Sequence, residues 1–351
     1  ATRVRMLDRA SQLALVAARD ALRDAAVEAD SLDRRRCGVF VGTGLAGAHS
    51  SDEGFRRLYG ERNPRVAPYT VLLAMHHAAA AWIALEHGFA GPSLTVSTAC
   101  SSSAVAIGEA AQKIALGAAD LAIAGGTEAP LSLGSLKAWE ALRTLAAVDA
   151  DDPSASCRPF SRDRSGMVLA EGAAFVVLES AAHAQARGAA PIARLAGYGL
   201  ATDVEHITRP SVDGQAAAMR AALADAALPP EAIGYVNAHG TGTPANDGVE
   251  TAAIRAVFGA HADALAVSST KSMHGHLLGA AGALEFAIAL MALRARLAPP
   301  TAHLRTPDPA CDLDYLADGA RSLPRLAAVM SNSFAFGGTN AVLVACRDDA
   351  R

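Results

Sequence analysis

One short pattern occurs twice in this chain and constrains its fold more than any other feature. An apolar, strand-like run stops at small polar residues and passes into a helical pattern, first at residues 96–100 (V-S-T-A-C) and again at residues 267–271 (V-S-S-T-K). Strand-like and helical segments alternate along the sequence, which indicates an α/β fold with largely parallel sheets. We therefore predict two related halves, residues 1–190 and 191–351, with reactive side chains at strand ends that face each other.

The spacing of apolar residues predicts where the individual elements lie. Intervals of three and four predict helices, and short apolar runs bounded by glycine, proline or polar residues predict strands. The polar segment 149–165 is expected to be a loop. Helices are predicted at 6–29, 71–86, 104–115, 136–145, 214–227, 247–258 and 277–293, and strands at 37–41, 121–124, 173–178, 192–198, 233–237, 265–267, 329–333 and 341–344.

Length and composition exclude several classes of protein. The chain has 351 residues, of which 51% are hydrophobic, and a formal net charge of −4. This length allows a large core, and a charge so close to zero argues against nucleic-acid binding. The most apolar helical segment, 277–293, carries Glu285 in its middle, so no membrane span is predicted. Residues 1–6 lack the apolar core of a signal peptide, and we expect a cytoplasmic protein.

The five cysteines are scattered and form no C-x-x-C pair. Neither a structural zinc site nor a disulfide framework is therefore predicted, which agrees with a reducing compartment.

A glycine-rich turn follows the first predicted strand. Residues 42–47 (G-T-G-L-A-G) match the G-x-G-x-x-G pattern of dinucleotide-binding loops. The residues after this turn do not open an apolar helix, and no strand ending in an acidic residue follows at the required distance. We therefore interpret the segment as a tight turn and not as a cofactor loop.

Cys100 lies where a predicted strand passes into a predicted helix. The serines at positions 101–103 can cap the first N–H groups of that helix. The positive end of the helix dipole favours a thiolate there, and the thiolate is the nucleophilic form of cysteine. A lone cysteine among small residues is more often buried and inert, so its partners must decide between the two interpretations.

Three further stretches place reactive residues at strand ends. His239 follows a strand within N-A-H-G-T-G-T, and Lys271 and His276 lie near a helix start within S-T-K-S-M-H-G-H-L-L-G-A-A-G. The third stretch, 331–340, is S-N-S-F-A-F-G-G-T-N, whose glycines free backbone N–H groups to point at a ligand. A metal interpretation of residues 273–276 lacks further ligands at suitable spacing. Together the residues fit covalent acyl transfer with electrostatic assistance to a second reactant.

These four stretches, T-A-C-S-S-S included, resemble the β-ketoacyl synthases, the condensing enzymes of fatty acid and polyketide synthesis. The resemblance extends in order from Met6 to the last strand. It implies a thiolase-like fold, in which two pseudo-repeated halves form five α-β-α-β-α layers. It also implies a homodimer, or a heterodimer with a ketosynthase-like subunit, and an acyl carrier protein as partner. Nucleic-acid or metal binding is not expected, and the substrates are carried on the phosphopantetheine of the carrier protein without a further cofactor.

The resemblance also implies a role for each matching residue. Cys100 accepts the acyl chain, and His239 and His276 hold and polarise the malonyl thioester during its decarboxylation. Lys271 tunes this pair, and Glu250 resembles the acidic partner that holds the lysine. Two neutral imidazoles can donate hydrogen bonds to an enolate without quenching it by proton transfer. The backbone N–H groups of Cys100 and Phe336 are implied to form the oxyanion hole. Phe336, Gly337 and Gly338 are implied to form a gate. Thr241, Thr243 and Phe334 are implied to contact the substrate.

The chain departs from the family pattern in three respects. The strand and glycine turn that usually precede the Met6 helix are absent, which suggests a truncated chain. Ala335 stands where many members have glycine in the gate loop, which stiffens it. The motifs are mixed: A-C-S-S-S and H-G-T-G-T resemble polyketide synthases, whereas K-S-M-x-G-H-L-L-G-A-A-G resembles freestanding fatty-acid elongation enzymes.

Two alternatives to an elongating synthase stay open from the sequence. A thiolase-like enzyme that uses coenzyme A esters needs a second cysteine as base, for which Cys346 is the candidate. A non-catalytic or chain-length-determining subunit of a heterodimer is the other alternative, although such subunits lack the cysteine that stands here at position 100. The pairing of two histidines, His239 and His276, sets the chain apart from the initiating synthases, which pair His with Asn.

Overall fold

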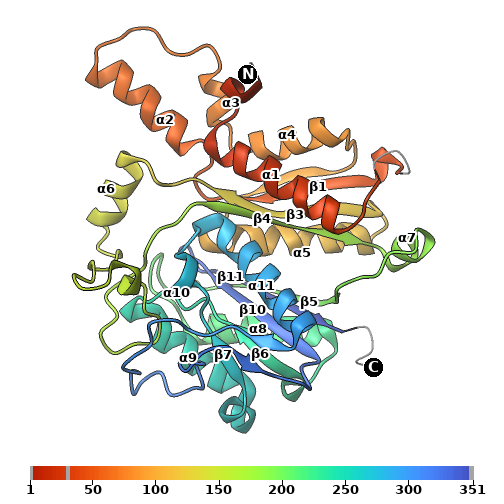
Figure 1. The fold of residues 1–351 in the computed structure, drawn as a ribbon, viewed down its shortest axis with the longest axis vertical. Helices are drawn as coiled ribbons and strands as arrows, with labels where there is room; N and C mark the ends of the chain where they lie inside the picture. The colour runs from red at the N-terminus through yellow and green to blue at the C-terminus, as the bar shows by residue number, and fades with distance from the viewer. Residues whose placement is uncertain (1–2, 29–31, 348–351) are drawn as a thin grey trace. The chain divides into compact units, whose positions relative to one another are not determined.

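The computed structural model describes residues 3–28 and 32–347 of the chain. These residues form two compact units (Figure 1). Unit one comprises residues 1–141, 170–190 and 277–284, and unit two comprises 142–169, 191–276 and 285–351. The division of the sequence into repeated halves after residue 190 stays a prediction.

Unit one is built on a four-stranded sheet in the order β2 (Ser93–Val96), β1 (Cys37–Gly42), β3 (Leu121–Glu128), β4 (Gly172–Glu179). The first three strands are parallel and β4 is antiparallel to β3. Strands β1 and β3 are buried along their whole length, because helices cover both faces of the sheet. Helices α1 (Arg9–Asp24) and α4 (Ala78–His87) cover one face, and α5 (Ser102–Ala115) covers the other (Figure 1).

The close approach of α5 to the sheet depends on glycine at the end of β1. A Cβ atom on Gly42 would lie only 2.2 Å from the backbone nitrogen of Ser103 in α5. Any other residue at this position would push the helix away from the strand ends, where the Cys100 turn lies.

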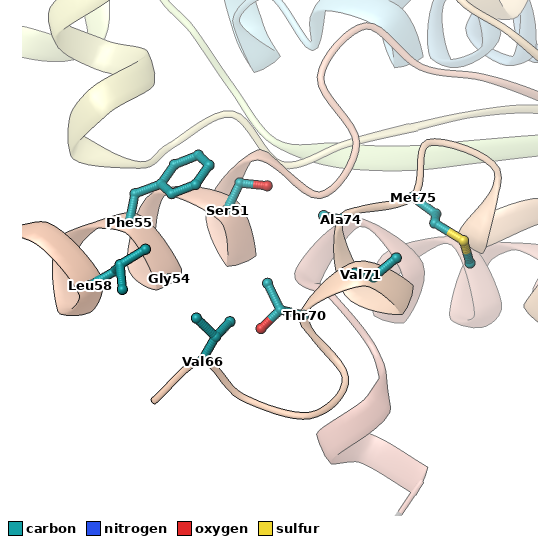
Figure 2. A pocket seen from close by; sticks show the side chains of 9 residues that line it. All are labelled: Ser51, Gly54, Phe55, Leu58, Val66, Thr70, Val71, Ala74 and Met75. Atoms are coloured by element: carbon teal, nitrogen blue, oxygen red, sulfur yellow. The ribbon is translucent and has the colours of Figure 1, made fainter. Parts of the chain in front are cut away.

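The connection between β1 and β2 differs from the prediction of one helix over residues 71–86. Met75 is extended, with ψ of 125°, and separates α3 (Thr70–Ala74) from α4. Helix α2 (Ala48–Phe55) and a short π-helical turn, Arg56–Gly60, precede α3 in the chain. An apolar cavity of about 360 Å³ lies between these segments (Figure 2), lined by Ser51, Gly54, Phe55, Leu58, Val66, Thr70, Val71, Ala74 and Met75.

Unit two is built on a five-stranded sheet in the order β5 (Arg194–Thr202), β11 (Thr339–Cys346), β10 (Ala328–Phe334), β6 (Ile233–Asn237), β7 (Ala266–Ser268). Strands β10, β6 and β7 are parallel, whereas β11 is antiparallel to both of its neighbours. The expectation of largely parallel sheets therefore fails at β4 and β11. Strand β11 must be antiparallel to β10, because the short turn between them permits only a hairpin.

Helices complete unit two around a large apolar core. Helices α8 (Val212–Ala226) and α9 (Pro244–Phe258) pack against each other, and α8 lies against β5 and β11. The core includes Met219, Ile254 and Val342. The other elements of the described residues include α6 (Leu133–Ala141), α7 (Ala181–Ala186), α10 (Lys271–His274), α11 (Ala281–Ala295), β8 (Leu297–Ala298) and β9 (Arg321–Ser322).

Within the described residues one helical segment, Leu278–Ala295, is long and apolar enough to cross a membrane by length and composition alone. Most of this segment, 61%, is buried inside the protein, and it carries the fully buried Glu285. Burial of this kind is typical of the core helix of a globular protein.

Candidate active site

Cys100 lies in a tight turn between a strand and a helix, as the sequence predicts. Strand β2 ends at Val96, residues Ala99–Ser101 form one 3₁₀ turn, and α5 begins at Ser102. Ala99 has a φ of 49°, in the left-handed region that costs a residue with a side chain about 1–2 kcal/mol. The Cys100 side chain is buried, with 7% exposed. A turn held in this unfavourable conformation fixes the direction of the thiol.

The serines after Cys100 close this turn and do not cap the helix. Ser102 Oγ accepts the N–H of Thr98 at 2.8 Å and donates to the carbonyl of Ala99 at 2.6 Å. Ser103 Oγ accepts the N–H of Ala283 at 2.8 Å. The residue before α5 makes no side-chain capping bond. The predicted caps are therefore wrong, because the turn ahead of the helix engages the hydroxyl of Ser102 and the N–H of Ala283 engages that of Ser103.

His239 follows β6 and is held by a buried carboxylate. Glu250 on α9 accepts the backbone N–H groups of His239 and Gly240, each at 2.8 Å. The side-chain amide of Asn332 on β10 donates to the same carboxylate at 3.1 Å. Glu250 therefore fixes the turn that carries the histidine.

Lys271 contacts His239 from the start of α10. Its Nζ donates to the carbonyl of His239 at 2.6 Å and lies 2.5 Å from Oε1 of Glu285 on α11. Both charged side chains are completely buried. The expected pairing of Lys271 with Glu250 is wrong, since the Glu250 carboxylate is already occupied by backbone N–H groups and the lysine pairs with Glu285.

The proton of neutral His239 can be assigned from the same contacts. Lys271 Nζ lies 3.4 Å from His239 Nδ1. A lysine ammonium group can only donate hydrogen bonds, so Nδ1 is the acceptor and Nε2 carries the proton. His239 thus presents a hydrogen-bond donor on the side of the ring away from Lys271.

His276 forms an edge-to-face pair with His239. The ring centroids are 5.4 Å apart, with an angle of 82° between the ring planes. The backbone N–H of His276 donates to the carbonyl of Val168 at 2.7 Å. Burial lowers the pKa of both histidines well below 6.5, and the nearby charge of Lys271 lowers it further. Both rings are therefore neutral at pH 7.

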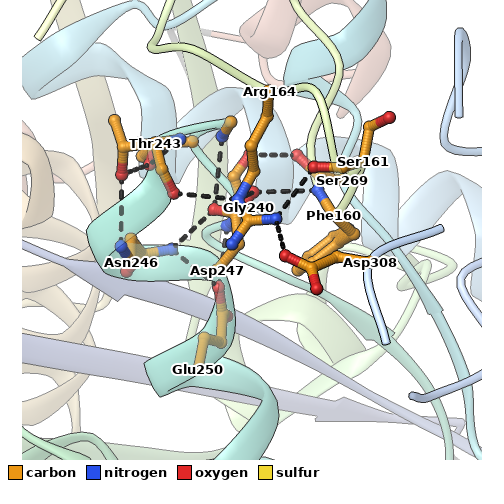
Figure 3. A network of polar contacts seen from close by, with 12 residues as sticks. Phe160, Ser161, Arg164, Gly240, Thr243, Asn246, Asp247, Glu250, Ser269 and Asp308 are labelled. Carbon is orange, nitrogen blue, oxygen red and sulfur yellow. Dashed lines mark hydrogen bonds and ion pairs between the residues drawn. The ribbon is translucent and has the colours of Figure 1, made fainter. Parts of the chain in front are cut away.

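The turn after His239 is tied down by a second buried carboxylate, Asp247 (Figure 3). Asp247 accepts the N–H of Gly242 at 3.2 Å and the N–H of Phe160 at 2.9 Å. Burial raises its pKa to about 6. Asp247 thus joins the turn to the segment 158–164 of the same unit.

Arg164 completes this network (Figure 3). Its Nε lies 3.5 Å from Asp247 and donates to the carbonyl of Thr243 at 3.2 Å, and its Nη1 lies 2.5 Å from Asp308. Thr243 Oγ1 also caps α9 by accepting a backbone N–H at 3.2 Å, and it lies 2.9 Å from the hydroxyl of Thr241. Both threonine hydroxyls therefore have partners within the turn.

Comparison with known proteins places the chain in a family. Residues 1–184 match the β-ketoacyl synthase N-terminal domain and residues 192–305 match the C-terminal domain. The chain belongs to the β-ketoacyl synthase family. Members of this family are condensing enzymes of the acyltransferase class, and the predicted fold class and enzyme class are thereby confirmed.

Two curated relatives illustrate the range of this family. Nodulation protein E of Rhizobium meliloti (strain 1021) is 48% identical over 96% of this chain and 82% of its own length. 3-Oxoacyl-[acyl-carrier-protein] synthase 2 of Coxiella burnetii is 42% identical over 98% of this chain and 83% of its own length.

Two solved ketosynthase structures have the same fold. One is a type II polyketide ketosynthase bound to a hexaketide, in complex with its acyl-carrier protein. It has a TM-score of 0.93 and 34% identity, and covers 97% of this chain and 85% of that one. The other is the ishigamide ketosynthase/chain length factor, with a TM-score of 0.91 and 34% identity. This match covers 97% of this chain and 83% of the other.

The loop that the sequence predicts to be a gate connects β10 to β11. Gly337 has a φ of 85° and donates its N–H to the carbonyl of Ile207 at 2.7 Å. Gly338 has a φ of 78° and donates its N–H to the carbonyl of Ala335 at 3.0 Å. The expectation that these N–H groups point at a ligand is wrong, because the glycines serve the conformation of the turn. The ring of Phe334 lies 6.0 Å from that of His239, whereas Phe336 is half-buried.

Two other candidates from the sequence have local partners. Nδ1 of His274 lies 2.7 Å from the carbonyl of Gly275 and its Nε2 lies 3.0 Å from Thr270 Oγ1, so both ring nitrogens are occupied. Cys346 is buried in β11, where it pairs with Ala328 of β10. The contacts of His274 therefore do not favour metal binding at residues 273–276. The position of Cys346 does not favour its role as the catalytic base of a thiolase-like enzyme.

Sequence reasoning missed four residues that shape the site of the synthase. Glu285 is a charged residue inside an otherwise apolar helix, which is a signal of a buried partner, whereas Asp247 lies in the polar first turn of α9, where an acidic residue is common. Arg164 lies in a segment that looked like a solvated loop, and Asn332 lies in a strand. Nothing in the sequence alone indicates the partners of these last two.

Proposed function

We propose that the chain is an elongating β-ketoacyl-acyl carrier protein synthase that works by two half-reactions. In the first, the Cys100 thiolate attacks the thioester of an acyl carrier protein, forms an acyl-enzyme and releases the carrier thiol. In the second, a malonyl thioester loses carbon dioxide, and the electron pair of the broken bond forms an enolate. The enolate carbon attacks the Cys100 thioester, and the thiolate leaves.

The neutral histidine pair is the observation that carries this proposal. An enolate oxygen needs donors that do not transfer a proton to the carbanion. His239 carries a proton on Nε2, and both imidazoles have a pKa well below neutrality. The buried charge of Lys271 keeps this state and adds a positive potential where negative charge develops.

The chain connection of His276 supports joint action with Cys100. Residues 277–284, which follow His276 directly, belong to the same unit as Cys100. Within that unit, Ala283 is bonded to Ser103, three residues after Cys100. Because consecutive Cα atoms are about 3.8 Å apart, His276 is directly tethered to residues 277–284. We propose that Cys100, His239 and His276 act in the same reaction.

The remaining roles follow from family membership. The backbone N–H groups of Cys100 and Phe336 are assigned to the oxyanion hole, and one such donor is worth about 3 kcal/mol in the transition state. Phe336 acts as the gate between the half-reactions, and Phe334, Thr241 and Thr243 shape the substrate channel.

The proposal also covers partners and compartment. An acyl carrier protein delivers both substrates, and a second ketosynthase-like subunit completes a homodimer or heterodimer. Within the part of the chain that the structure describes, the five cysteines are buried and form no disulfide, which fits a reducing cytoplasm.

The test is intact-mass analysis after incubation with a panel of acyl-carrier proteins of different chain length. We expect an acyl adduct on the wild type and on Cys157→Ala, but none on Cys100→Ala. Cys157 is the matched control, since it is another buried cysteine, and burial raises the pKa of its thiol to about 11. Absence of an adduct with every donor would overturn the catalytic proposal and favour a non-catalytic subunit.

A further inference from the structure

Glu128 is a buried acidic residue of unit one with no assigned role. It is the last residue of β3 and its side chain is fully buried. Oε2 accepts the N–H of Gly44 at 2.6 Å and that of Gly279 at 3.0 Å. Oε1 accepts the N–H of Leu45 at 2.9 Å and the hydroxyl of Thr43 at 3.2 Å. Every bond donates to the carboxylate, which is the arrangement that an ionised side chain requires.

This carboxylate explains the glycine-rich turn after β1. In a phosphate-binding loop the N–H groups of such a turn face an anion from solution. Here the N–H groups of Gly44 and Leu45 face the carboxylate of Glu128. The turn therefore binds an internal anion, and the interpretation of residues 42–47 as a tight turn agrees with the structure.

The turn held by Glu128 is directly connected to the strand that leads to Cys100. The strand order in this sheet is β2, β1, β3, so the turn after β1 lies between Glu128 and the end of β2. The N–H of Thr43 donates to the carbonyl of Val96, the last residue of β2, at 3.0 Å. Cys100 follows four residues later.

The second segment bound to Glu128 begins directly after His276. Gly279 lies three residues beyond this histidine and approaches the turn very closely. A Cβ atom on Gly279 would lie 2.3 Å from the nitrogen of Gly44 and 2.7 Å from Oε2 of Glu128. The carboxylate thus bridges two backbone segments that touch each other.

We propose that Glu128 is a positioning residue of the condensation reaction. Its carboxylate fixes the segment after His276 against the turn that adjoins the Cys100 strand, and so sets the position of the histidine during attack on the acyl-enzyme. This inference rests on the proposed function for its catalytic consequence. The anchoring itself can be tested independently.

The variant Glu128→Gln keeps the size of the side chain but replaces one acceptor oxygen by a donor. If the amide oxygen takes the place of Oε2, the bonds to Gly44 and Gly279 persist and the N–H of Leu45 faces an NH₂ group. If it takes the place of Oε1, the N–H groups of Gly44 and Gly279 lose their acceptor. Either orientation leaves at least one backbone N–H without a partner.

Hydrogen exchange and single-turnover kinetics on the full chain test the proposal. In Glu128→Gln, we expect amide exchange to rise about tenfold in peptides covering residues 43–46 or 277–280. The condensation rate per acylated enzyme should fall about 10- to 100-fold, whereas the rate of Cys100 acylation changes far less. Glu179→Gln is the matched control, because Glu179 also ends a strand of this sheet but lies at the opposite end of the paired strands β3 and β4, where it pairs with Arg187.

Several results would overturn the proposal. These are unchanged exchange in both segments, an equal loss of acylation and condensation, or the same kinetic split in Glu179→Gln. If Glu128→Gln does not fold, Glu128→Asp replaces it, since the shorter side chain keeps the charge but cannot reach all four donors. Failure of the wild type to be acylated would overturn the proposed function instead, and the exchange data would still decide whether Glu128 anchors the two segments.

Discussion

Lys271 and Glu285 form an ion pair between two fully buried side chains, with 2.5 Å between Nζ and Oε1. Removing two charges from water costs several kcal/mol for each ion, which their attraction repays only in part. Such a pair contributes little to stability compared with apolar residues of similar size. Its value here is electrostatic, because the ammonium group contacts His239 and helps to keep both histidines neutral.

The first prediction separates stability from catalysis at this pair. Glu285→Leu alone leaves the Lys271 charge buried without a counter-ion and should destabilise the protein by about 3–5 kcal/mol. The double variant Lys271→Met/Glu285→Leu should recover most of that loss, yet condense substrates at a small fraction of the wild-type rate. Urea unfolding and a condensation assay measure the two effects. A double variant as unstable as the single one would contradict the argument.

The prediction of the lysine's partner failed for a physical reason. Glu250 and Glu285 are both acidic residues in helices near the reactive histidines, and the sequence does not show which one faces Lys271. Glu250 is used by the backbone of its own turn, only ten or eleven residues away in sequence. The sequence shows the unusual feature of Glu285, a charge in the middle of an apolar helix, but our prediction from it concerned only a membrane span.

The second prediction concerns the pH dependence of stability. Burial is the main cause that lowers the pKa of His274 from 6.5 to about 4. Between these values the unfolded chain binds a proton that the folded protein does not, so the free energy of unfolding falls as pH decreases. The contribution is complete above pH 6.5 and its loss levels off below pH 4, for a total of up to about 3 kcal/mol. Replacing His274 by Gln should flatten the pH profile by about this amount, as measured by urea unfolding at pH 7 and pH 4.5. Equal slopes for the two proteins would refute the assignment.

The third prediction concerns Arg164. Its side chain is 7% exposed, and it neutralises Asp247, which is completely buried. Arg164→Met leaves this carboxylate without its cation and should cost about 3 kcal/mol in unfolding free energy. The control is Arg255→Met, because Arg255 also bridges two carboxylates but lies at the surface. Its loss should cost less than about 1 kcal/mol. Similar losses in the two variants would show that the buried network has no special weight.

The sequence predicts the local positions of the candidate reactive residues far better than the contacts that hold them. Cys100, His239, Lys271 and His276 all lie at strand ends or helix starts, since local apolar periodicity determines those positions. The hydroxyl of Ser103 was expected to cap its own helix, but its actual partner is the N–H of Ala283, 180 residues away. Only the folded chain brings these two residues together.

The last prediction compares two adjacent glycines of the loop between β10 and β11, the proposed gate. A Cβ atom on Gly337 would meet no atom within 4 Å, whereas one on Gly338 would lie 2.4 Å from the carbonyl oxygen of Asp203. Both residues have positive φ, so alanine at either position costs about 1–2 kcal/mol of backbone strain. Only Gly338→Ala must also displace the loop from Asp203, which otherwise donates its N–H to the carbonyl of Gly338 at 2.8 Å. We expect Gly338→Ala to lower the condensation rate about 100-fold and Gly337→Ala to lower it less than about tenfold. Steady-state kinetics at matched folded concentration measure the difference, and equal losses would show that strain in the turn, and not the contact with Asp203, limits the gate.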